Sequence, residues 1–300
     1  MAGGAPRLRR GDNGLVRAPS LAVLLCGLLL LSAAAPAVSP ARRQATAAKR
    51  ATTIWAVGDA ENSARARVLA ARVRRGRPDR LLYLGDVYEH GTAREFSQGY
   101  DALYGSLGRR TIPTPGNHEW GNRDVGYRPY WRAKLGRPMP DWHRHTLPDG
   151  WQVLSLNSEA PHGPGSPQAR WLADAVRRPG TCRIAIWHRP RWSSGWHGDQ
   201  ADMATLWNGL RGRARLVLSG HDHDLQRFAD RDGLRQIVSG GGGRPNVPIP
   251  RGSRGRLRFV NRITPGGARL TLSRGRATIE MVASSGRVLD RSVATCRPVA

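Results

Sequence analysis

The sequence is poor in cysteine and in long apolar runs. It has three cysteines in 300 residues, and only Cys182 and Cys296 lie beyond the first forty, so the main part of the chain can form at most one disulfide. The apolar run from Leu21 to Ala35 is too short to span a bilayer comfortably. No internal repeat is visible, which excludes a repeat architecture. These absences leave a globular chain, long enough for one large domain with a substantial core or two small ones.

The N-terminal segment is typical of a secretory signal peptide. Four arginines precede the apolar run and the small residues Ala35-Pro36-Ala37 end it, which predicts cleavage after Ala37. An uncleaved N-terminal anchor is the alternative. We therefore expect a signal peptide over residues 1–37, a flexible lead-in over residues 38–51, and a secreted or otherwise extracytoplasmic protein without a stable membrane span after cleavage. In an oxidising compartment Cys182 and Cys296 could form a disulfide; otherwise they are two unrelated buried thiols.

Acidic residues are scarce. Lys and Arg total 48 against 22 Asp and Glu, which gives a net charge of +26. Such a surface attracts phosphate esters, nucleic acids and anionic envelopes. However, all but two of the basic residues are arginine, and they are spread over the whole chain, which indicates a compositional bias rather than a binding stripe. The charge supports an anionic substrate, and nucleic-acid binding is not required to explain it.

Short apolar runs that end in polar clusters recur along the chain. They are TIWAVGD, RLLYLGDVY, RTIPTPGNHE, WQVLSLNSE, RIAIWHRP and ARLVLSGHDH. Runs of this kind are typical of strands buried on both faces of a sheet. Helical patterns lie between them, one after Ser166 as N-cap and one over residues 199–210, and a Gly- and Pro-rich loop is expected over residues 240–255. The alternation predicts an α/β fold in one domain over residues 52–299, with late antiparallel strands extending a second layer.

Polar side chains gather where these strands end. They are Asp59, Asp86, Tyr88, Asn117, His118, His188, His221 and His223. Because function in α/β sheets gathers at the carboxyl ends of the strands, we expect these side chains to face one cleft. Carboxylate and imidazole ligands suit Zn²⁺, Fe or Mn, and two such ions can clamp a phosphate ester. Each motif alone has an ordinary structural explanation, but the ordered set predicts a metal site.

The ordered set GD, GDVY, GNHE, IWH and GHDH resembles the metallophosphoesterase (calcineurin-like) superfamily and, within it, the purple acid phosphatases. The pattern of that group is GD, GDxxY, GNH(D/E), a strand-end His and GHxH. The likeness extends over residues 54–244 and looks like the bacterial single-domain members. It implies a four-layer α/β/β/α sandwich with a dimetal site at the carboxyl ends of the strands. It also implies acid phosphatase activity, in which a metal-bound hydroxide attacks a small-molecule phosphate monoester.

The resemblance assigns roles to individual residues. The first metal, Fe(III), is expected to bind Asp59, Asp86, Tyr88 and His223, since phenolate oxygen favours ferric iron. The second metal, Fe(II), Zn or Mn, is expected to bind Asp86, Asn117, His188 and His221, with Asp86 bridging the two. The expected catalytic residues are His118, which contacts the phosphoryl group or protonates the leaving oxygen, Glu119, which orients His118, and His197 near the leaving group. The chain is expected to be a monomer or an oligomer of undetermined size.

Several alternatives stay open. GHDH continues into Leu225-Gln226, where family members commonly have Tyr-Glu, and Glu61 is an alternative first-site ligand if Tyr88 does not bind. A phosphodiesterase or nucleotidase on the same scaffold and an inactive polyanion-binding envelope protein are the alternative functions. Five loop tryptophans either form an aromatic wall for the substrate or close the edge of the core: Trp120, Trp131, Trp142, Trp192 and Trp196.

Overall fold

The computed structural model describes residues 51–178, 181–246 and 256–296. All of them belong to the second of the two units into which the chain divides, Ala47–Ala300. The predicted signal peptide, the lead-in up to residue 50 and residues 247–255 of the predicted loop lie outside the described residues. No helix in the described part of the chain is long and apolar enough to cross a bilayer.

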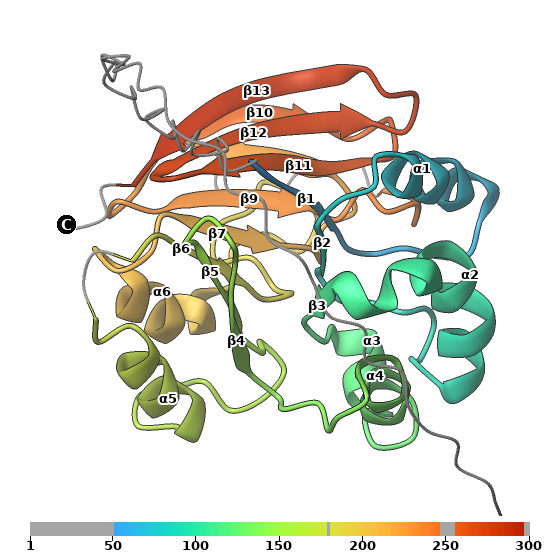
Figure 1. The fold of residues 1–300 in the computed structure, drawn as a ribbon, viewed down its shortest axis with the longest axis horizontal. Coiled ribbons are helices and arrows are strands. Elements are labelled where there is room, and N and C mark those ends of the chain that lie inside the picture. Colours follow the sequence, from blue (N-terminus) through green and yellow to red (C-terminus); the bar gives the residue numbers. More distant parts are fainter. Residues whose placement is uncertain (1–50, 179–180, 247–255, 297–300) are drawn as a thin grey trace, which may run out of the picture. The chain divides into compact units, whose positions relative to one another are not determined.

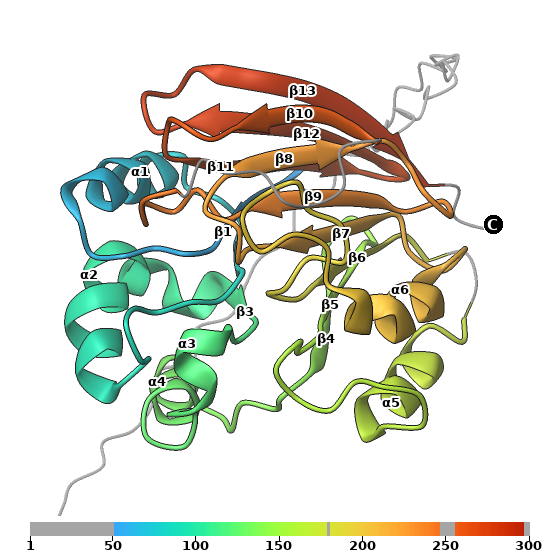
Figure 2. The same ribbon diagram turned by 180° about the vertical axis from the view of Figure 1, so that it is seen from behind.

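Two β-sheets lie at the centre of the described domain (Figures 1 and 2), with strand orders β13-β12-β11-β1-β2-β3 and β10-β8-β9-β7-β6-β5-β4. The strands of the first sheet are β1 (Thr52–Val57), β2 (Arg80–Tyr83), β3 (Thr111–Pro113), β11 (Gly266–Ser273), β12 (Arg276–Ala283) and β13 (Val288–Thr295). Those of the second are β4 (His143–Thr146), β5 (Gln152–Ser155), β6 (Arg183–Ile186), β7 (Leu216–Ser219), β8 (Leu225–Phe228), β9 (Arg235–Ser239) and β10 (Leu257–Asn261). Each of the six apolar runs forms a strand, and β1, β2 and β3, like β5, β6 and β7, run parallel.

Helices cover the outer face of each sheet (Figure 1). Over the first sheet lie α1 (Ala64–Arg75), the π-helical segment η1 (Glu95–Tyr100), α2 (Asp101–Tyr104), the 3-10 segment η2 (Gly105–Arg110) and α4 (Tyr127–Leu135). Over the second sheet lie α5 (Pro167–Ala175), the 3-10 segment η3 (Ala201–Met203) and α6 (Ala204–Leu210). A single turn of helix, α3 (Asn117–Trp120), follows β3.

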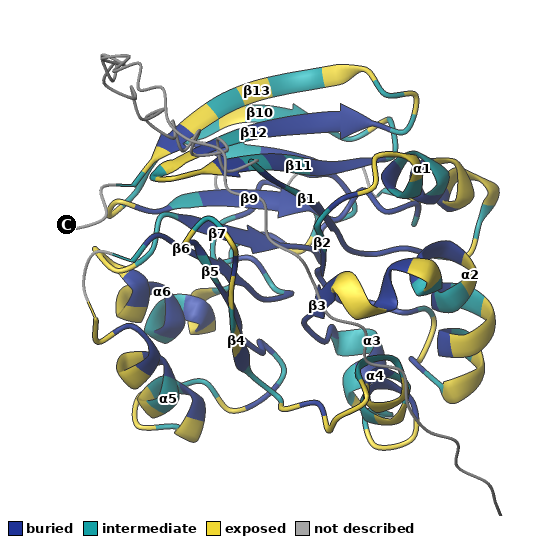
Figure 3. Ribbon diagram, viewed as in Figure 1, coloured by how far each residue is buried: buried dark blue, intermediate teal, exposed yellow. Residues whose placement is uncertain are grey.

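Three apolar clusters fill the spaces between these layers. The central cluster contains residues of both sheets, and one further cluster lies between each sheet and its helices. Because side chains alternate along a strand, Ile54 and Ala56 of β1 belong to the central cluster while Trp55 and Val57 belong to the cluster under α1. β1 is accordingly buried on both faces, whereas the edge strand β13 is largely exposed or half-buried (Figure 3). The predicted four-layer α/β/β/α sandwich is confirmed.

Two of the predicted features differ from the observed structure. The first helical pattern is α5, and the hydroxyl of Ser166 accepts from the backbone N–H of Ala169 as an N-cap, but α6 begins only at Ala204. The late strands do not all extend the second sheet: β10 pairs with β8 there, whereas β11 pairs with β1 and carries β12 and β13 onto the first sheet. Alternating apolar residues fix which face of a strand is buried, but they do not fix which sheet edge the strand joins.

Covalent and polar links join the two sheets. Cys182 and Cys296 form a disulfide across 114 residues, which confirms the predicted pairing and ties the end of β13 to the start of β6. Near the carboxyl ends of the strands, the hydroxyl of Ser239 donates to the carbonyl of Ala56 (2.8 Å) and accepts from the N–H of Ala268 (2.9 Å). These links hold the strand ends of the two sheets in a fixed relation.

Candidate metal centre

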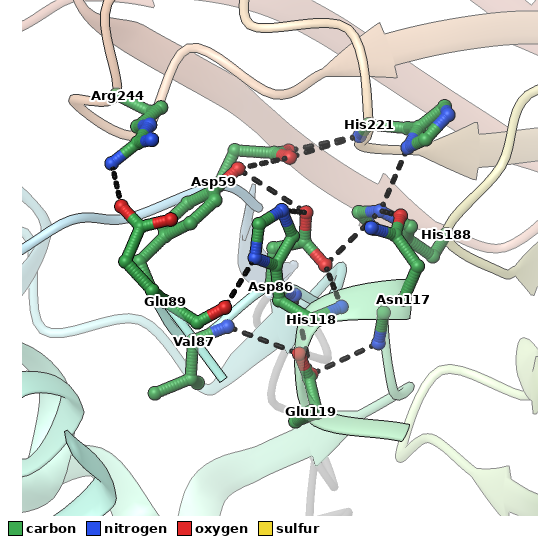
Figure 4. Close-up of polar contacts among 12 residues, drawn as sticks. Asp59, Asp86, Val87, Glu89, Asn117, His118, Glu119, His188, His221 and Arg244 are labelled. Atoms are coloured by element: carbon green, nitrogen blue, oxygen red, sulfur yellow. Dashed lines mark hydrogen bonds and ion pairs between the residues drawn. The ribbon is translucent and has the colours of Figure 1, made fainter. Parts of the chain in front are cut away.

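Polar side chains from both sheets meet beyond the carboxyl ends of the parallel strands (Figure 4). Asp59 follows β1, Asp86 and Tyr88 follow β2, Asn117 begins α3, His188 follows β6, and His221 and His223 follow β7. Three of these residues have left-handed backbone conformations, with φ of 60° at Asp59, 65° at Asp86 and 70° at His221. Such a conformation costs a non-glycine residue about 1–3 kcal/mol and occurs mainly at functional sites. The sharp turns aim successive side chains at one place.

The hydroxyl of Tyr88 lies at the centre of a first group of ligand atoms. Its oxygen is 3.2 Å from Oδ1 of Asp59, 3.2 Å from Oδ2 of Asp86 and 2.9 Å from Nε2 of His223. Both carboxylate oxygens of Asp59 accept from the backbone N–H of His221, at 3.1 and 3.0 Å. The four residues expected at the first metal therefore converge, although Tyr88 follows Asp86 by two residues rather than by the three of GDxxY.

His188 lies at the centre of a second group. Its Nε2 is 3.1 Å from Oδ1 of Asn117, 3.1 Å from Nδ1 of His221 and 3.3 Å from Oδ1 of Asp86. One ligand atom from each of Asp86, His188 and His221 lies within 4.8 Å of the other two. Asp86 presents Oδ2 to the first group and Oδ1 to the second. That is the arrangement a bridging carboxylate requires.

Backbone carbonyls fix two of the imidazoles. Nδ1 of His188 lies 2.8 Å from the carbonyl oxygen of Leu84, and Nδ1 of His223 lies 2.8 Å from that of Pro245. Because a carbonyl oxygen can only accept, each Nδ1 carries the hydrogen, and each Nε2 in the neutral ring presents a lone pair to the centre. The rings are therefore set as metal ligands in both tautomer and orientation.

Burial and charge shift the titration of the centre. Burial alone would raise the pKa of Asp86, but the charge of His188 and its hydrogen bond outweigh burial and hold that pKa below its usual range. Burial disfavours the charged imidazole of His188, but Asp86 outweighs burial and raises the pKa of His188 to about 10. Burial, with the carboxylates of Asp59 and Asp86, raises the pKa of Tyr88 well above its usual value. A metal ion binding here would therefore displace protons from both His188 and Tyr88.

Two glycines allow the backbone to approach the carboxylates. A Cβ on Gly116 would lie 2.1 Å from Oδ1 of Asp86, and a Cβ on Gly220 would lie 2.5 Å from Oδ2 of Asp59. Neither distance leaves room for a side chain. The glycines of the GNHE and GHDH motifs are thus required by the position of the ligand oxygens.

Glu119 lies beneath the ligand loops rather than beside His118. Its Oε1 accepts from the backbone N–H groups of Gly116 (2.9 Å) and Asp86 (3.2 Å), and its Oε2 accepts from that of Val87 (3.0 Å). Burial and the charge of Asp86 raise the pKa of Glu119 to about 7. Within the described residues, none of its hydrogen bonds reaches His118, so the prediction that Glu119 orients His118 is wrong. Glu119 instead joins the loop after β2 to the loop after β3.

His118 and His197 flank the centre on different sides. The Nδ1 of His118 is 2.5 Å from the carbonyl oxygen of Glu89, and its Nε2 is 3.8 Å from Oδ2 of Asp86. The ring of His197 stacks on that of His221, with 4.0 Å between centroids. The two side chains are 28% and 35% exposed, so both can reach a ligand that arrives from solvent.

Asp222 holds His197 in this position. Although it stands between two ligand histidines, its side chain turns away from both ligand groups, as expected for alternating residues. Its Oδ1 accepts from the backbone N–H of His197 (2.9 Å) and lies 3.1 Å from the Nδ1 of that ring, while Oδ2 accepts from the hydroxyl of Ser193. The motif pattern gave no signal for this support, because the partners lie 25 and 29 residues away in the chain.

Gln226 supports the same loop from below. It is fully buried, accepts from the backbone N–H of Ser194 (2.8 Å), and donates to the hydroxyl of Ser193 (2.9 Å) and to Oδ1 of Asp224 (2.8 Å). A glutamate at this position would lose both donors and would face the carboxylate of Asp224. The departure from the family pattern thus changes the support of the His197 loop and does not touch a ligand.

Arg244 is a further part of the centre that the sequence did not reveal. Its guanidinium lies 4.6 Å from the centroid of the Tyr88 ring and pairs with the carboxylates of Glu89 and, at 3.3 Å, Glu61. In an arginine-rich chain, no pattern distinguishes this arginine from the others. Because Glu61 pairs with Arg244 while Tyr88 occupies the first group, the structure favours Tyr88 over Glu61 as the ligand.

Of the two alternatives for the loop tryptophans, closing the edge of the core applies to three. Trp131 is fully buried in the cluster under the helices of the first sheet. Trp142 and Trp192 pack against the cluster beneath α5 and α6. These three tryptophans close the edges of the core, so the substrate-wall interpretation is wrong for them.

The model of the calcineurin-like phosphoesterase family matches residues 52–225 of this chain. The range contains the polar strand ends described above. The chain belongs to the calcineurin-like phosphoesterase family. No curated protein sequence matches this phosphoesterase chain.

Solved structures with this phosphoesterase fold include GAP50, the anchor in the inner membrane complex of Plasmodium, with a TM-score of 0.68, 16% identity and coverage of 84% of this chain and 90% of that one. The purple acid phosphatase PPD1 from yellow lupin seeds gives a TM-score of 0.64, 17% identity and coverage of 81% and 53%. The chain therefore spans about half the length of the lupin enzyme. A dimetal phosphatase from Danio rerio gives a TM-score of 0.56, 14% identity and coverage of 82% and 99%.

The residues present fit the two metal ions that this metallophosphoesterase family implies. Metal–nitrogen bonds of about 2.1 Å place neighbouring ligand atoms roughly 3 Å apart, and the contacts of His188 with its neighbours are 3.1 to 3.3 Å. Asp59, Asp86, Tyr88 and His223 would hold one ion, and Asp86, Asn117, His188 and His221 the other.

Proposed function

We propose that this metallophosphoesterase hydrolyses phosphate monoesters in the manner of purple acid phosphatases. The observation that carries the proposal is the position of Asp86, whose two oxygens face separate groups of ligand atoms at 3.2 and 3.3 Å. When bound, two metal ions would neutralise ester oxygens and make water acidic enough to supply a hydroxide nucleophile. The basic surface supports an anionic substrate, because it raises the local concentration of phosphate esters.

The protein's own groups would position the ester and move a proton. With Nδ1 of His118 directed at the carbonyl of Glu89, its Nε2 is the ring nitrogen left to face the phosphoryl group and to protonate the leaving oxygen. His197 reaches the same space from the other side, since Asp222 and the stacking on His221 fix its ring. The two exposed histidines therefore bracket the place where the leaving group would lie.

The proposal extends to metal identity. The hydroxyl of Tyr88 lies within 3.2 Å of the other first-site ligands, and a phenolate oxygen favours Fe(III), so the first metal is proposed to be ferric iron and the second Fe(II), Zn or Mn. Metal analysis and a visible spectrum of the purified protein test this. About one tyrosinate-bound iron per chain, with a violet band that Tyr88→Phe abolishes, is the expected result; two Zn or Mn ions and no band would refute it.

We also propose export with cleavage after Ala37. The disulfide between Cys182 and Cys296 supports an oxidising compartment, because such bonds rarely persist in the cytosol. N-terminal sequencing of the protein recovered outside the cytoplasm tests the cleavage site. A mature protein that still begins at Met1 would refute the cleavage.

Substrate hydrolysis tests the catalytic proposal directly. An aryl phosphate monoester, a bis-aryl diester and a nucleotide are compared at acid and neutral pH, with His118→Asn as the active-site variant. His162→Asn is the matched control, because His162 contacts the carbonyl of Ala160 and Asp202 outside the ligand groups. We expect faster monoester turnover, lost by about 100-fold or more in His118→Asn only. Faster diester turnover would establish the phosphodiesterase alternative, and metal-free protein that binds nucleic acid with a steep salt dependence would establish the polyanion-binding alternative.

A further inference from the structure

Arg183, the first residue of β6, is a buried cation at the end of the sheet opposite to the metal centre. The residue is only 1% exposed. Its Nε donates to Oε1 of Gln152 (3.1 Å), and its two terminal nitrogens donate to the backbone carbonyls of Arg213 (3.0 Å) and Arg178 (2.7 Å). Within residues 51–178, 181–246 and 256–296, no carboxylate pairs with it. Arg183 is therefore hydrogen-bonded but not neutralised.

A buried charge without a counter-ion is unusual. Removing a guanidinium from water costs several kcal/mol, and dipoles of carbonyl and amide groups offset only part of that cost. Burial lowers the pKa of Arg183, and the positive charges of Arg213 and Arg144 lower it further. The surroundings of Arg183 therefore carry additional positive charge. A guanidinium has five N–H groups, and the protein atoms named above occupy three of them. Charge and unused donors both indicate a missing anion.

A pocket of about 390 Å³ opens beside Arg183. Arg144 of β4, together with Arg177 and Arg178 after α5, also lines it, and the hydroxyls of Thr146 and Thr181 add further polar groups. The single acid among its described lining residues, Asp174, pairs with Arg177 at 2.6 Å. The pocket thus has four guanidinium groups against one carboxylate that is already paired.

We propose that this pocket binds a small phosphate-class oxyanion at a site separate from the metal centre. Guanidinium groups suit the oxygens of phosphate because they donate two parallel hydrogen bonds. The strand β6 runs from Arg183 to Ile186 and then reaches the ligand His188, so five residues of extended chain, roughly 17 Å, separate the two sites. The proposal does not rest on the proposed catalytic function.

The overall basic charge of the chain does not explain this pocket. Among the buried residues Arg183 is the one arginine, and unlike Arg269 and Arg291, which pair with Glu280, it has no carboxylate partner in the described part of the chain. A general attraction of anions to the surface would be screened at physiological salt, where charges more than about 8 Å apart interact weakly. Binding that persists in 150 mM salt, at about one anion per chain, distinguishes a built pocket from surface charge.

Calorimetric titration with pyrophosphate tests the proposal. The protein is titrated as purified and again after its metals have been removed by chelation, because any binding at the metal centre depends on the metals. We expect one site per chain to persist after chelation. In Arg144→Gln/Arg178→Gln this site should weaken at least tenfold, while monoester hydrolysis by the metal-loaded protein stays unchanged.

The variants are designed to leave the fold intact. The side chains of Arg144 and Arg178 are exposed, and Arg178 binds Arg183 through its backbone carbonyl, which the substitution keeps. Arg75→Gln/Arg109→Gln removes the same charge from exposed positions on α1 and η2 and serves as the control. Loss of all binding on chelation, or equal weakening by the control pair, would overturn the proposal. The single variant Arg144→Gln gives the same reading if the double variant fails to fold.

Discussion

Glu119→Gln tests whether a buried carboxylate holds the two ligand loops together. Three backbone N–H groups converge on it, two on Oε1 and one on Oε2 at 3.0 Å. A glutamine keeps one acceptor oxygen, but its NH₂ group must face either the N–H of Val87 or the N–H groups of Gly116 and Asp86. Two donors then oppose each other in a place without solvent.

The magnitude follows from those contacts. Above the Glu119 pKa of about 7, hydrogen bonds to its charged carboxylate contribute about 1.5–3 kcal/mol, and a buried donor left without an acceptor adds about 1–3 kcal/mol. We therefore expect Glu119→Gln to lower the free energy of unfolding by about 2–4 kcal/mol. Since the loops that it joins carry Asp86 and Asn117, we also expect metal affinity to fall by about 10- to 100-fold.

Glu95→Gln is the matched control. Its carboxylate also accepts from three backbone N–H groups, those of Glu89, His90 and Thr92 at 2.7, 3.1 and 2.8 Å, but it is half-exposed. Water can replace a lost acceptor there, so we expect a loss below about 1 kcal/mol and unchanged metal affinity. Denaturant unfolding of the metal-free protein measures stability, and competition with a chelator measures affinity. Equal losses in the two variants would refute the argument from burial.

Three further predictions concern pH, the disulfide and the His197 loop. Burial lowers the pKa of His143 to about 3 and that of His145 to about 4, so these two side chains bind more protons in the unfolded chain between about pH 6.5 and pH 3; their contribution to the unfolding free energy should be full above pH 6.5 and fall by several kcal/mol with acid, and an acid limb of the stability profile that His143→Gln/His145→Gln leaves unchanged in denaturant titrations would contradict this. Cys182→Ser removes the disulfide that closes a loop of 114 residues, and we expect the free energy of unfolding measured by calorimetry to fall by about 2–5 kcal/mol. Monoesterase activity at 25 °C should persist, and lost activity with unchanged stability would contradict this. Asp222→Ala should lower kcat at unchanged metal content, because His197 loses both hydrogen bonds to Oδ1; reduced metal content would instead place Asp222 among the ligands.

The fold was largely readable from local patterns. Short apolar runs are typical of strands buried on both faces, and each of the six runs forms a strand, although β3 lies at the edge of its sheet. The helix α1 was missed because five of its twelve residues are arginine and interrupt the apolar face formed by Ala66, Leu69, Ala70 and Val73. The placement of β11 to β13 on the first sheet was also beyond the sequence, since pairing with β1 depends on which edge remains free after the parallel strands have formed.

The sequence by itself determined which residues could bind metal, because every candidate ligand stands shortly after an apolar run that forms a strand. Only the tertiary structure decided which residues support the ligand loops. Four residues support the centre through partners that lie 25 or more residues away in the chain, and no local pattern identifies them: Glu119, Asp222, Gln226 and Arg244. The same holds for Arg183, whose missing counter-ion becomes visible only once the chain has buried it. The chemistry of a side chain can be read from the sequence, but its burial and its hydrogen-bond or ion-pair partners depend on the folded structure.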